Sequence, residues 1–410
     1  MKYMISPNPE TKLVFPKGFL LGAATSAHQV EGNNINNDWW QAETAGKVPK
    51  SGMAADHYNR FEEDFQIARD IGLNAMRISI EWARIEPVEG KFENKEVEHY
   101  RKVLRKMKEL GLTRMVTLWH FTLPNWVAEK GGFENSQNVE AFTRFVWFVA
   151  NNLGSEIDLW CTINEPEVYV GMGYRLGKWP PFKSNLFLML RVFKNMIAAH
   201  KKAYRAIKQV RPDAKIGIVK NNMYYEVYNK KSPFDQILVY LAKQISNHYF
   251  LDKIKSELDF IGLNYYFYKL MRLHFPGGFT DMNQNFVNQP DDPIAKQRSD
   301  MGWRTFPEGI YHVLGDLKKY KKPIYITENG IANARDDMRQ DFIRKHLMWT
   351  KQAIDEGVDV RGYFYWSLID NYEWADGYGP LFGLVEVNRE TMERKIRKSA
   401  DVLKEIEIAK

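Results

Sequence analysis

Short apolar runs recur along the chain, and each is followed by a longer stretch whose apolar residues are spaced three and four apart. The longer stretches, such as those that start at His99 and Ala198, have the period of amphipathic helices. The alternation predicts about eight strand–helix units. The strand-like runs begin at Phe19, Asn74, Thr113, Leu159, Lys215, Phe260, Pro323 and Gly362.

These runs are nearly continuous in apolar residues, which is typical of parallel strands that are covered on their faces. No linker rich in Pro, Gly or Ser separates them, so we expect an α/β fold with a single domain, a (β/α)8 TIM barrel over residues 1–410. A doubly wound open sheet is the alternative. That fold would need a nucleotide loop, and the glycine-rich stretches at Gly171 and Gly377 have one residue too many for a dinucleotide fingerprint.

Charge and cysteine content exclude several classes of protein. The 58 Lys and Arg residues exceed the 51 Asp and Glu residues by a small, interspersed surplus, so no nucleic-acid partner is expected. The basic bunch from Lys395 to Lys398 predicts a solvated C-terminal helix. The single cysteine, Cys161, excludes an internal disulfide and lies in an apolar run, which predicts a buried thiol. We expect no metal or cofactor, and we interpret His57 and His200 as structural.

The chain also lacks membrane signals. Its first twelve residues contain no apolar stretch of signal-peptide length, and no segment approaches a membrane span, so a cytoplasmic location is expected. The amphipathic stretch from Ser184 predicts a barrel helix that faces the core rather than a membrane-surface element. Membrane association is therefore not expected, and the oligomeric state is left open.

Polar and aromatic residues follow the strand-like runs, and the carboxyl ends of barrel strands meet in one shared bowl. Two carboxylates lie directly after apolar runs, Glu165 in TINEP and Glu328 in YITENG. The long polar loop from Pro276 to Asp292 is expected to wall the site. The residues at the strand ends are His28, Gln29, Glu31, Arg77, Glu81, Trp119, His120, Asn164, Glu165, Asn264, Tyr265, Tyr266, Glu328, Asn329, Trp366, Glu373 and Trp374.

Two carboxylates at the fourth and seventh strand ends suit the cleavage of a glycosidic bond. One carboxylic acid would protonate the leaving oxygen, and the other would attack the anomeric carbon. A separation of about 5 to 5.5 Å would make the enzyme retaining, with a covalent glycosyl-enzyme intermediate.

Several long motifs in order along the chain resemble glycoside hydrolase family 1, the retaining β-glycosidases, and the wording NYEWA is most similar to archaeal and thermophilic members. The motifs are FLLGAATSAHQVEG at Phe19, RISIEWARIEP at Arg77, TLWHFTLPNW at Thr117, TINEP at Thr162, DFIGLNYY at Asp259, YITENG at Tyr325 and YWSLIDNYEWADGYGPLFGLV at Tyr365.

The resemblance implies a role for each matching residue. Glu165 would be the acid/base and Glu328 the nucleophile, which Arg77 and Tyr266 would keep ionised, while Asn164 would hold the sugar 2-hydroxyl. Trp366 would form the apolar floor under the sugar ring. The other residues that we expect to bind substrate are Gln29, His120, Trp119, Glu373, Trp374 and Phe382.

The resemblance implies an exo-acting retaining β-glycosidase for ordinary, unphosphorylated O-glycosides, because Glu165 is not Gln and the Glu373–Trp374 pair is intact. We expect it to remove terminal non-reducing β-D-glycosyl residues from β-glucosides, and also from β-galactosides, β-fucosides and β-mannosides, with transglycosylation as a side reaction. The partner is then a small-molecule β-glycoside or oligosaccharide. Phe121 and Leu381 depart from the family pattern, which leaves the preferred sugar open. An endo-acting glucanase and a non-catalytic carbohydrate-binding barrel are the alternatives.

Overall fold

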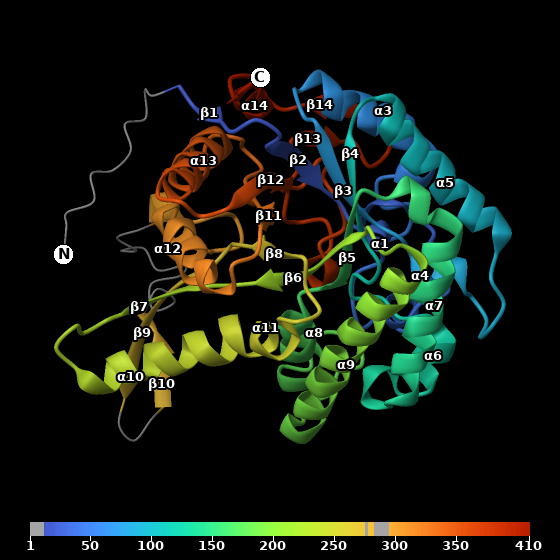
Figure 1. Cartoon of the computed structure of the whole chain (residues 1–410), viewed down its shortest axis with the longest axis horizontal. Coiled ribbons are helices and arrows are strands. Elements are labelled where there is room, and N and C mark those ends of the chain that lie inside the picture. Colours follow the sequence, from blue (N-terminus) through green and yellow to red (C-terminus); the bar gives the residue numbers. More distant parts are fainter. Residues whose placement is uncertain (1–11, 275–277, 283–294) are drawn as a thin grey trace.

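A closed barrel of eight parallel strands forms the centre of the molecule (Figure 1). The computed structural model describes residues 12–274, 278–282 and 295–410. The strands follow one another around the barrel in chain order, and the last strand, β12, pairs with the first, β2, to close it. This confirms the barrel and all eight predicted strands. Their bounds are β2 (Leu20–Ala24), β3 (Ala75–Ser79), β4 (Thr113–Thr117), β5 (Leu159–Asn164), β6 (Lys215–Asn221), β8 (Phe260–Asn264), β11 (Ile324–Asn329) and β12 (Val360–Trp366).

Helices surround the barrel and connect its strands, as Figure 1 shows. The longer ones are α3 (His57–Asp70), α5 (Asn94–Glu109), α7 (Gln137–Leu153), α9 (Leu186–Val210), α10 (Pro233–Ala242), α12 (Glu308–Leu317) and α13 (Arg339–Asp355). The shorter ones are α1 (Ala27–Val30), α2 (Asp38–Thr44), α4 (Trp82–Ile85), α6 (Asn125–Glu129), α8 (Pro166–Val170), α11 (Tyr249–Ile254) and α14 (Asp401–Lys404). Two π-helical turns, Gly171–Arg175 and Lys243–His248, follow α8 and α10.

The barrel strands are apolar throughout because both of their faces are covered. Every residue of β3, β5, β8 and β11 is buried. Side chains such as Met115, Cys161 and Phe260 fill the inside of the barrel, while a larger cluster packs between the strands and the helices. Burial of about 25 cal/mol per Å² of apolar surface stabilises both layers.

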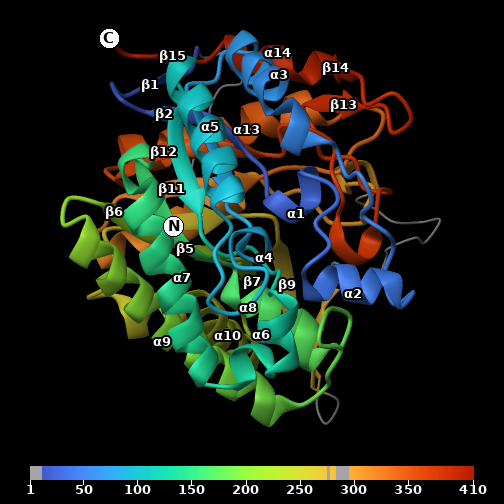
Figure 2. The same cartoon turned by 90° about the vertical axis from the view of Figure 1, so that its right-hand side faces the viewer.

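Smaller sheets lie outside the ring of barrel strands. The parallel pair of β1 (Val14–Phe15) and β15 (Glu407–Ile408) lies at the end where the barrel strands begin, and α2, α6 and α8 lie at the opposite end (Figure 2). Three further strands, β7 (Tyr224–Val227), β9 (Tyr268–His274) and β10 (Gly278–Asp281), form a separate sheet. The polar strand ends identified in the sequence therefore share one open end of the barrel.

Two predictions about local structure need correction. The basic bunch at Lys395 is not helical, because β14 (Arg394–Ile396) pairs with β13 (Val385–Val387) as an antiparallel ladder. The amphipathic stretch from Ser184 does form α9, and its later turns face the core through residues such as Met196. In its first turn Leu188 and Met189 also pack against the core, but Leu186 and Phe187 are exposed.

Other predictions are confirmed. Cys161 is buried, and burial raises the pKa of its thiol to about 11, so it is an inert core residue. His57 contacts Asp64 at 2.7 Å, and His200 contacts Thr162 at 2.7 Å, so both are structural. Most of the predicted loop from Pro276 to Asp292 lies outside the described residues. Among the helices that are described, none is long and apolar enough to cross a membrane.

Candidate active site

The chain turns sharply where β5 delivers Glu165 to the open end of the barrel. Asn164 is the last residue of the strand, and Glu165 has a φ of 42° and a ψ of 62°, a left-handed conformation that costs energy for a residue with a Cβ. Its backbone NH donates to the carbonyl of Val219 at 2.9 Å, and Pro166 then starts α8. The turn aims the Glu165 side chain at the barrel axis instead of continuing the strand.

Two amide groups hydrogen-bond to the Glu165 carboxyl. The side-chain amides of Asn221 and Asn264 donate to its Oε1 at 2.9 and 2.8 Å. Burial is the largest influence on this group, and the charge of Glu328 adds to it, so that the pKa of Glu165 rises to about 8. Glu165 therefore holds a proton at neutral pH.

Charged and hydrogen-bonding groups surround Glu328 instead. Arg77 donates from Nη1 to Oε1 at 2.5 Å, and the Tyr266 hydroxyl donates to Oε2 at 2.9 Å. Burial raises the pKa of Glu328, but the guanidinium of Arg77 and hydrogen bonds from Arg77, Tyr266 and Asn264 lower it. Of the two coupled carboxylates, Glu328 alone contacts a cation among the described residues. The negative charge therefore resides on Glu328, and the proton resides on Glu165.

Arg77 also connects the two carboxylate sites. Its Nη2 donates to the side-chain oxygen of Asn164 at 2.6 Å, and its Nε donates to the hydroxyl of Thr117 at 3.0 Å. Asn164 in turn contacts Nε2 of His120 at 3.2 Å. The other ring nitrogen of His120, Nδ1, is buried and has no partner among the described residues. A polar atom of this kind is free to bind a ligand hydroxyl.

A second polar group gathers beside the carboxylates. The amide nitrogen of Gln29 donates to the carbonyl of Tyr372 at 2.9 Å and lies 3.4 Å from Oε2 of Glu373. The indole of Trp366 donates to Oε1 of Glu373 at 3.1 Å. Burial, more than any other influence, raises the pKa of Glu373 to about 8. Gln29 lies in α1 after the first barrel strand, Trp366 ends the eighth strand, and Glu373 lies in the loop that follows it. Together they present donors and acceptors side by side.

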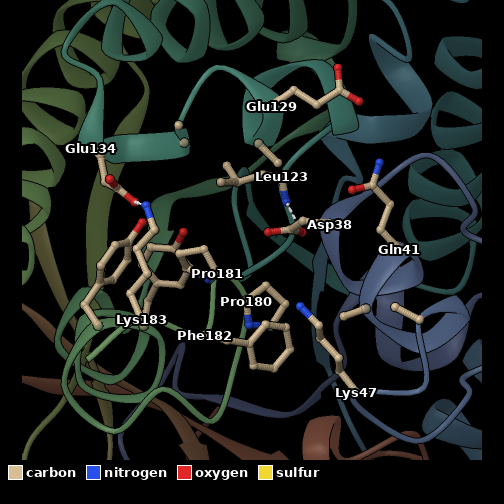
Figure 3. Close-up of a pocket in the computed structure, with 17 residues that line it drawn as sticks. Asp38, Gln41, Lys47, Leu123, Glu129, Glu134, Pro180, Pro181, Phe182 and Lys183 are labelled. Atoms are coloured by element: carbon tan, nitrogen blue, oxygen red, sulfur yellow. Dashed lines mark hydrogen bonds and ion pairs between the residues drawn. The ribbon is translucent and has the colours of Figure 1, made fainter. Parts of the chain in front are cut away.

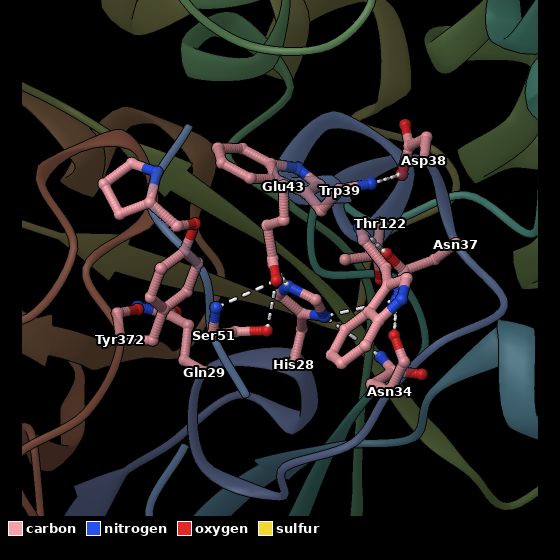
Figure 4. A network of polar contacts seen from close by, with 12 residues as sticks. His28, Gln29, Asn34, Asn37, Asp38, Trp39, Glu43, Ser51, Thr122 and Tyr372 are labelled. Carbon is pink, nitrogen blue, oxygen red and sulfur yellow. Dashed lines mark hydrogen bonds and ion pairs between the residues drawn. The ribbon is translucent and has the colours of Figure 1, made fainter. Parts of the chain in front are cut away.

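A buried network holds the short helix that carries Gln29 (Figure 4). His28 contacts Glu43 at 3.0 Å, and Glu43 accepts hydrogen bonds from the NH and the hydroxyl of Ser51 at 2.8 and 2.7 Å. The other ring nitrogen of His28 contacts Asn37 at 3.1 Å. The network fixes α1 and hence the direction of Gln29.

Aromatic rings wall the same site. The imidazole of His120 stacks on the rings of Trp366 and Trp374, with centroids 6.0 and 6.1 Å apart. Trp374 also packs against Trp39 at 4.6 Å. Phe382 lies edge-on to Tyr266 at 6.5 Å. Flat apolar faces beside hydroxyl-binding groups are what a sugar ring requires.

The sequence-predicted residues thus come together, with one exception. Trp119 lies apart from the group, because its ring packs edge-on against Phe133 and Tyr169, outside the barrel strands. Its neighbour His120 faces the site instead, since successive residues of an extended segment point to opposite sides. The predicted sugar contact of Trp119 therefore needs correction to a packing role.

Four residues near Glu165 were missed as functional candidates. Asn264 was noticed at a strand end but received no role, and Asn221 lies in β6 with no motif to mark it. The side chain of Lys220 is fully buried and forms an ion pair with Glu167, whose Oε1 accepts a hydrogen bond from the NH of Asn221 at 2.6 Å. A lysine within an apolar strand, IGIVKN, was the signal that could have revealed this pair.

A separate cavity of about 460 Å³ contains none of these side chains (Figure 3). It is lined by residues such as Asp38, Lys47, Leu123 and Phe182. Burial raises the pKa of Asp38 to about 7, and the NH of Leu123 donates to its carboxylate at 2.9 Å. No group of three or more His, Cys, Asp or Glu side chains in the described part of the chain is arranged to hold a metal ion.

The fold and the site together define a (β/α)8 barrel glycosidase, with two buried carboxylates among amides, an arginine and stacked rings. Comparisons with known proteins agree. The model of the glycosyl hydrolase family 1 matches residues 11–254 and 251–410. A 1,4-beta-D-glucan glucohydrolase of Thermotoga neapolitana is 32% identical over 94% of this chain and 96% of its own length. A beta-galactosidase of Pyrococcus woesei is 31% identical over 96% of this chain and 97% of its own length.

The structural comparison gives the same result. A beta-glycosidase from Pyrococcus horikoshii superposes with a TM-score of 0.89 and 40% identity, over 96% of this chain and 94% of that one. The chain belongs to glycosyl hydrolase family 1, and it is a β-glucosidase-type glycosyl hydrolase.

Proposed function

We propose that this protein is an exo-acting, retaining β-glycosidase in which Glu328 is the nucleophile and Glu165 is the acid/base. The observation that carries the proposal is the unequal surroundings of the two carboxylates. Glu328 accepts from Arg77 and Tyr266, whereas Glu165, among the described residues, accepts only from the amides of Asn221 and Asn264. One group is thus prepared to attack and the other to donate a proton.

In the first step, a carboxylate oxygen of Glu328 attacks the anomeric carbon, and the glycosidic C–O bond breaks. The proton of Glu165 moves to the leaving oxygen, so the aglycone departs as a neutral alcohol and a glycosyl ester remains on Glu328. In the second step, Glu165 takes a proton from water, and the water oxygen attacks the anomeric carbon. The ester bond breaks, and both carboxyl groups return to their first state.

Sugar binding is proposed for the polar and aromatic groups beside the carboxylates. Gln29 and Glu373 offer a donor and an acceptor for adjacent hydroxyls, and Trp366 and Trp374 offer ring faces for the C–H surface of the sugar. Asn164 is held by Arg77, which orients its free amide hydrogen for the 2-hydroxyl. The related chains include both a glucohydrolase and a beta-galactosidase, so we propose β-glucosides, with β-galactosides, β-fucosides and β-mannosides as further substrates. An acceptor alcohol that reaches the intermediate gives transglycosylation.

The test is turnover of a panel of p-nitrophenyl β-glycosides by the wild type and by Glu328→Gly. The proposal expects the variant to lose turnover by about 10³-fold or more, and added azide or formate to restore it by filling the space of the lost carboxylate. Unchanged turnover in the variant, or no rescue by either anion in a folded variant, would contradict it. An exposed variant, Glu129→Gln, is the control.

Chain-length products separate the proposal from an endo-acting glucanase. An exo-acting enzyme releases a monosaccharide from cello-oligosaccharides at the start of the reaction, whereas an endo-acting enzyme first shortens long glucans. A barrel that only binds carbohydrate would release no nitrophenol at all. The cytoplasmic location remains a prediction from the sequence, to be checked by cell fractionation.

A further inference from the structure

Exposed apolar side chains gather on α9, on α10, and on the turn and the start of α11 that follow α10. On α10, only Asp235 and Val239 are buried. Nine of the 18 large apolar residues that are exposed in the described part of the chain lie in this one region. We call these nine residues the apolar surface: Leu186, Phe187, Leu190, Phe234, Ile237, Tyr240, Leu241, Ile245 and Tyr249.

A groove of about 830 Å³ separates α9 from the turn and the short helix α11 that follow α10. Leu190 and Phe193 of α9 line one side, and Ile245 and Tyr249 line the other. The rings of Phe193 and Tyr249 stack with centroids 6.0 Å apart, which fixes the floor. In Figure 1, the start of α9 and α10 both lie in the lower part of the molecule. The apolar surface therefore extends from α9 across the groove to the turn Lys243–His248, and from that turn back along α10, which leads directly into it.

Cations that form no ion pair with the described residues border the groove, and one of them, Lys253, lies over the ring of Tyr249. Arg175, Lys194 and Lys253 line it, and none of them forms an ion pair with any residue that the structure describes. The one acidic residue in the lining is Glu167, which is already paired with the buried Lys220. The border of the groove is thus positively charged.

The groove also lies beside the open end of the barrel. Glu167, in its wall, is two residues from Glu165, and α8 follows directly from β5. In Figure 2, α8 lies away from β1 and β15, while α9 runs along the side of the barrel, from the turn after α8 back to the start of β6. Whatever covers the apolar surface therefore lies on the same side of the molecule as the catalytic opening.

We propose that the apolar surface docks on a lipid bilayer that contains anionic lipid. The exposed rings enter the interface between head groups and acyl chains, and the bordering cations meet lipid phosphates. The contact is peripheral, because none of the described helices can cross a membrane. This reverses the expectation from the sequence that membrane association is absent.

A second copy of the chain fits the same surface poorly. Closed dimers pair a surface with itself around a two-fold axis. Such pairing would bring the cations Arg175, Lys194 and Lys253 of one copy near those of the other, and the one acidic residue in the groove lining, Glu167, is already paired with Lys220. An anionic bilayer satisfies both the apolar side chains and the charges.

The experiment is co-sedimentation of the full chain with vesicles of phosphatidylcholine alone and of phosphatidylcholine mixed with phosphatidylglycerol, at about 0.1 M salt. The triple variant Phe187→Ser/Phe234→Ser/Ile245→Ser removes side chains that are 84%, 66% and 68% exposed, so it should fold. A second triple variant changes Arg175, Lys194 and Lys253 to Gln. The control, Val88→Ser/Trp147→Ser/Ile396→Ser, removes exposed apolar side chains outside the apolar surface.

The proposal expects the wild type and the control to sediment with the anionic vesicles. Either test variant should partition about tenfold less, while the melting temperature and the turnover of p-nitrophenyl β-glucoside stay unchanged. Wild type that stays in the supernatant, or an apolar variant that sediments equally, would overturn it. A wild-type dimer that becomes monomeric in the apolar variant, without vesicle binding, would assign the surface to self-association instead. None of these results depends on the roles of Glu165 and Glu328.

Discussion

Arg77 and Glu328 are 251 residues apart in the chain and form a buried ion pair of 2.5 Å across the inside of the barrel. The two residues belong to β3 and β11, which are not neighbours in the sheet. The pair places a fixed positive charge beside Glu328, whereas no described cation contacts Glu165. That asymmetry underlies the proposed division of labour between Glu328 and Glu165.

Replacing Glu165 by Gln should remove the proton donor without changing its size. The wild type needs Glu165 protonated, so its activity should fall as pH rises through about 8, the raised pKa of this group. Glutamine does not titrate, so this basic limb should disappear. The kcat for alkyl glycosides should drop by about 10²- to 10⁴-fold. For glycosides with very acidic leaving groups, which need no proton from Glu165, the rate of the first step should drop much less. The measurement is the pH profile of kcat/KM on both substrates. A basic limb that persists in the variant would exclude Glu165 as the acid.

Replacing Arg77 by Met should change the acidic limb of the pH profile. Without the guanidinium, the pKa of Glu328 rises further, so the acidic limb of the kcat/KM profile should move to higher pH. The free energy of unfolding should also fall by about 3–5 kcal/mol, because a buried carboxylate loses its partner.

Arg114→Met is the matched control for that change. Arg114 is also buried and pairs with Asp158 at 2.6 Å, but it lies near the start of β4, away from the carboxylates. It should lower stability without moving the acidic limb. Equal pH profiles for the two variants would contradict the role given to Arg77.

Replacing Lys220 by Met should disturb Glu165 through Glu167. The single variant leaves the Glu167 charge buried without a partner, and that charge raises the pKa of Glu165. We expect the basic limb to move to higher pH and the free energy of unfolding to fall by about 3–5 kcal/mol. The double variant Lys220→Met/Glu167→Gln should recover most of both effects, since no charge then remains unpaired. Chemical denaturation and pH profiles of the full double-mutant cycle measure the coupling, and additive effects would contradict it.

Acid stability should depend on Asp64. Burial raises the pKa of this carboxyl, but hydrogen bonds from His57 and Arg394 outweigh burial, so its pKa lies below the ordinary value of 3.8. A lowered folded-state pKa stabilises the protein above pH 3.8, and this stabilisation is lost as pH falls further. Asp64→Asn should therefore lower the free energy of unfolding at neutral pH by about 3–5 kcal/mol and flatten its decline in acid. Urea unfolding across the acidic range tests this, and an unchanged slope would refute it.

The apolar period of the sequence predicted the barrel well. Parallel strands covered on both faces must be apolar throughout. Each of the eight strands therefore appears in the sequence as a local apolar run, which can be recognised without knowing which strands it pairs with. The strand ends are equally local, which is why Glu165, Glu328, Arg77 and Gln29 were placed correctly at one end of the barrel. The local pattern predicted the wrong element at Lys395. The run of basic residues indicated a helix, but this segment forms β14, because it pairs with β13.

Only the tertiary structure decided which groups touch. The pairing of Arg77 with Glu328, the amide of Asn264 on Glu165 and the ion pair of Lys220 with Glu167 join segments that closure of the barrel brings together. It also decided which apolar residues are covered: Met196 and Phe187 look alike in the α9 pattern, yet only Met196 meets the core. The apolar period shows which face of a helix is apolar. A residue on that face is buried only where another element packs against its turn. The sequence by itself thus determined the fold and the chemistry at its open end, while contact and exposure depended on packing between distant segments.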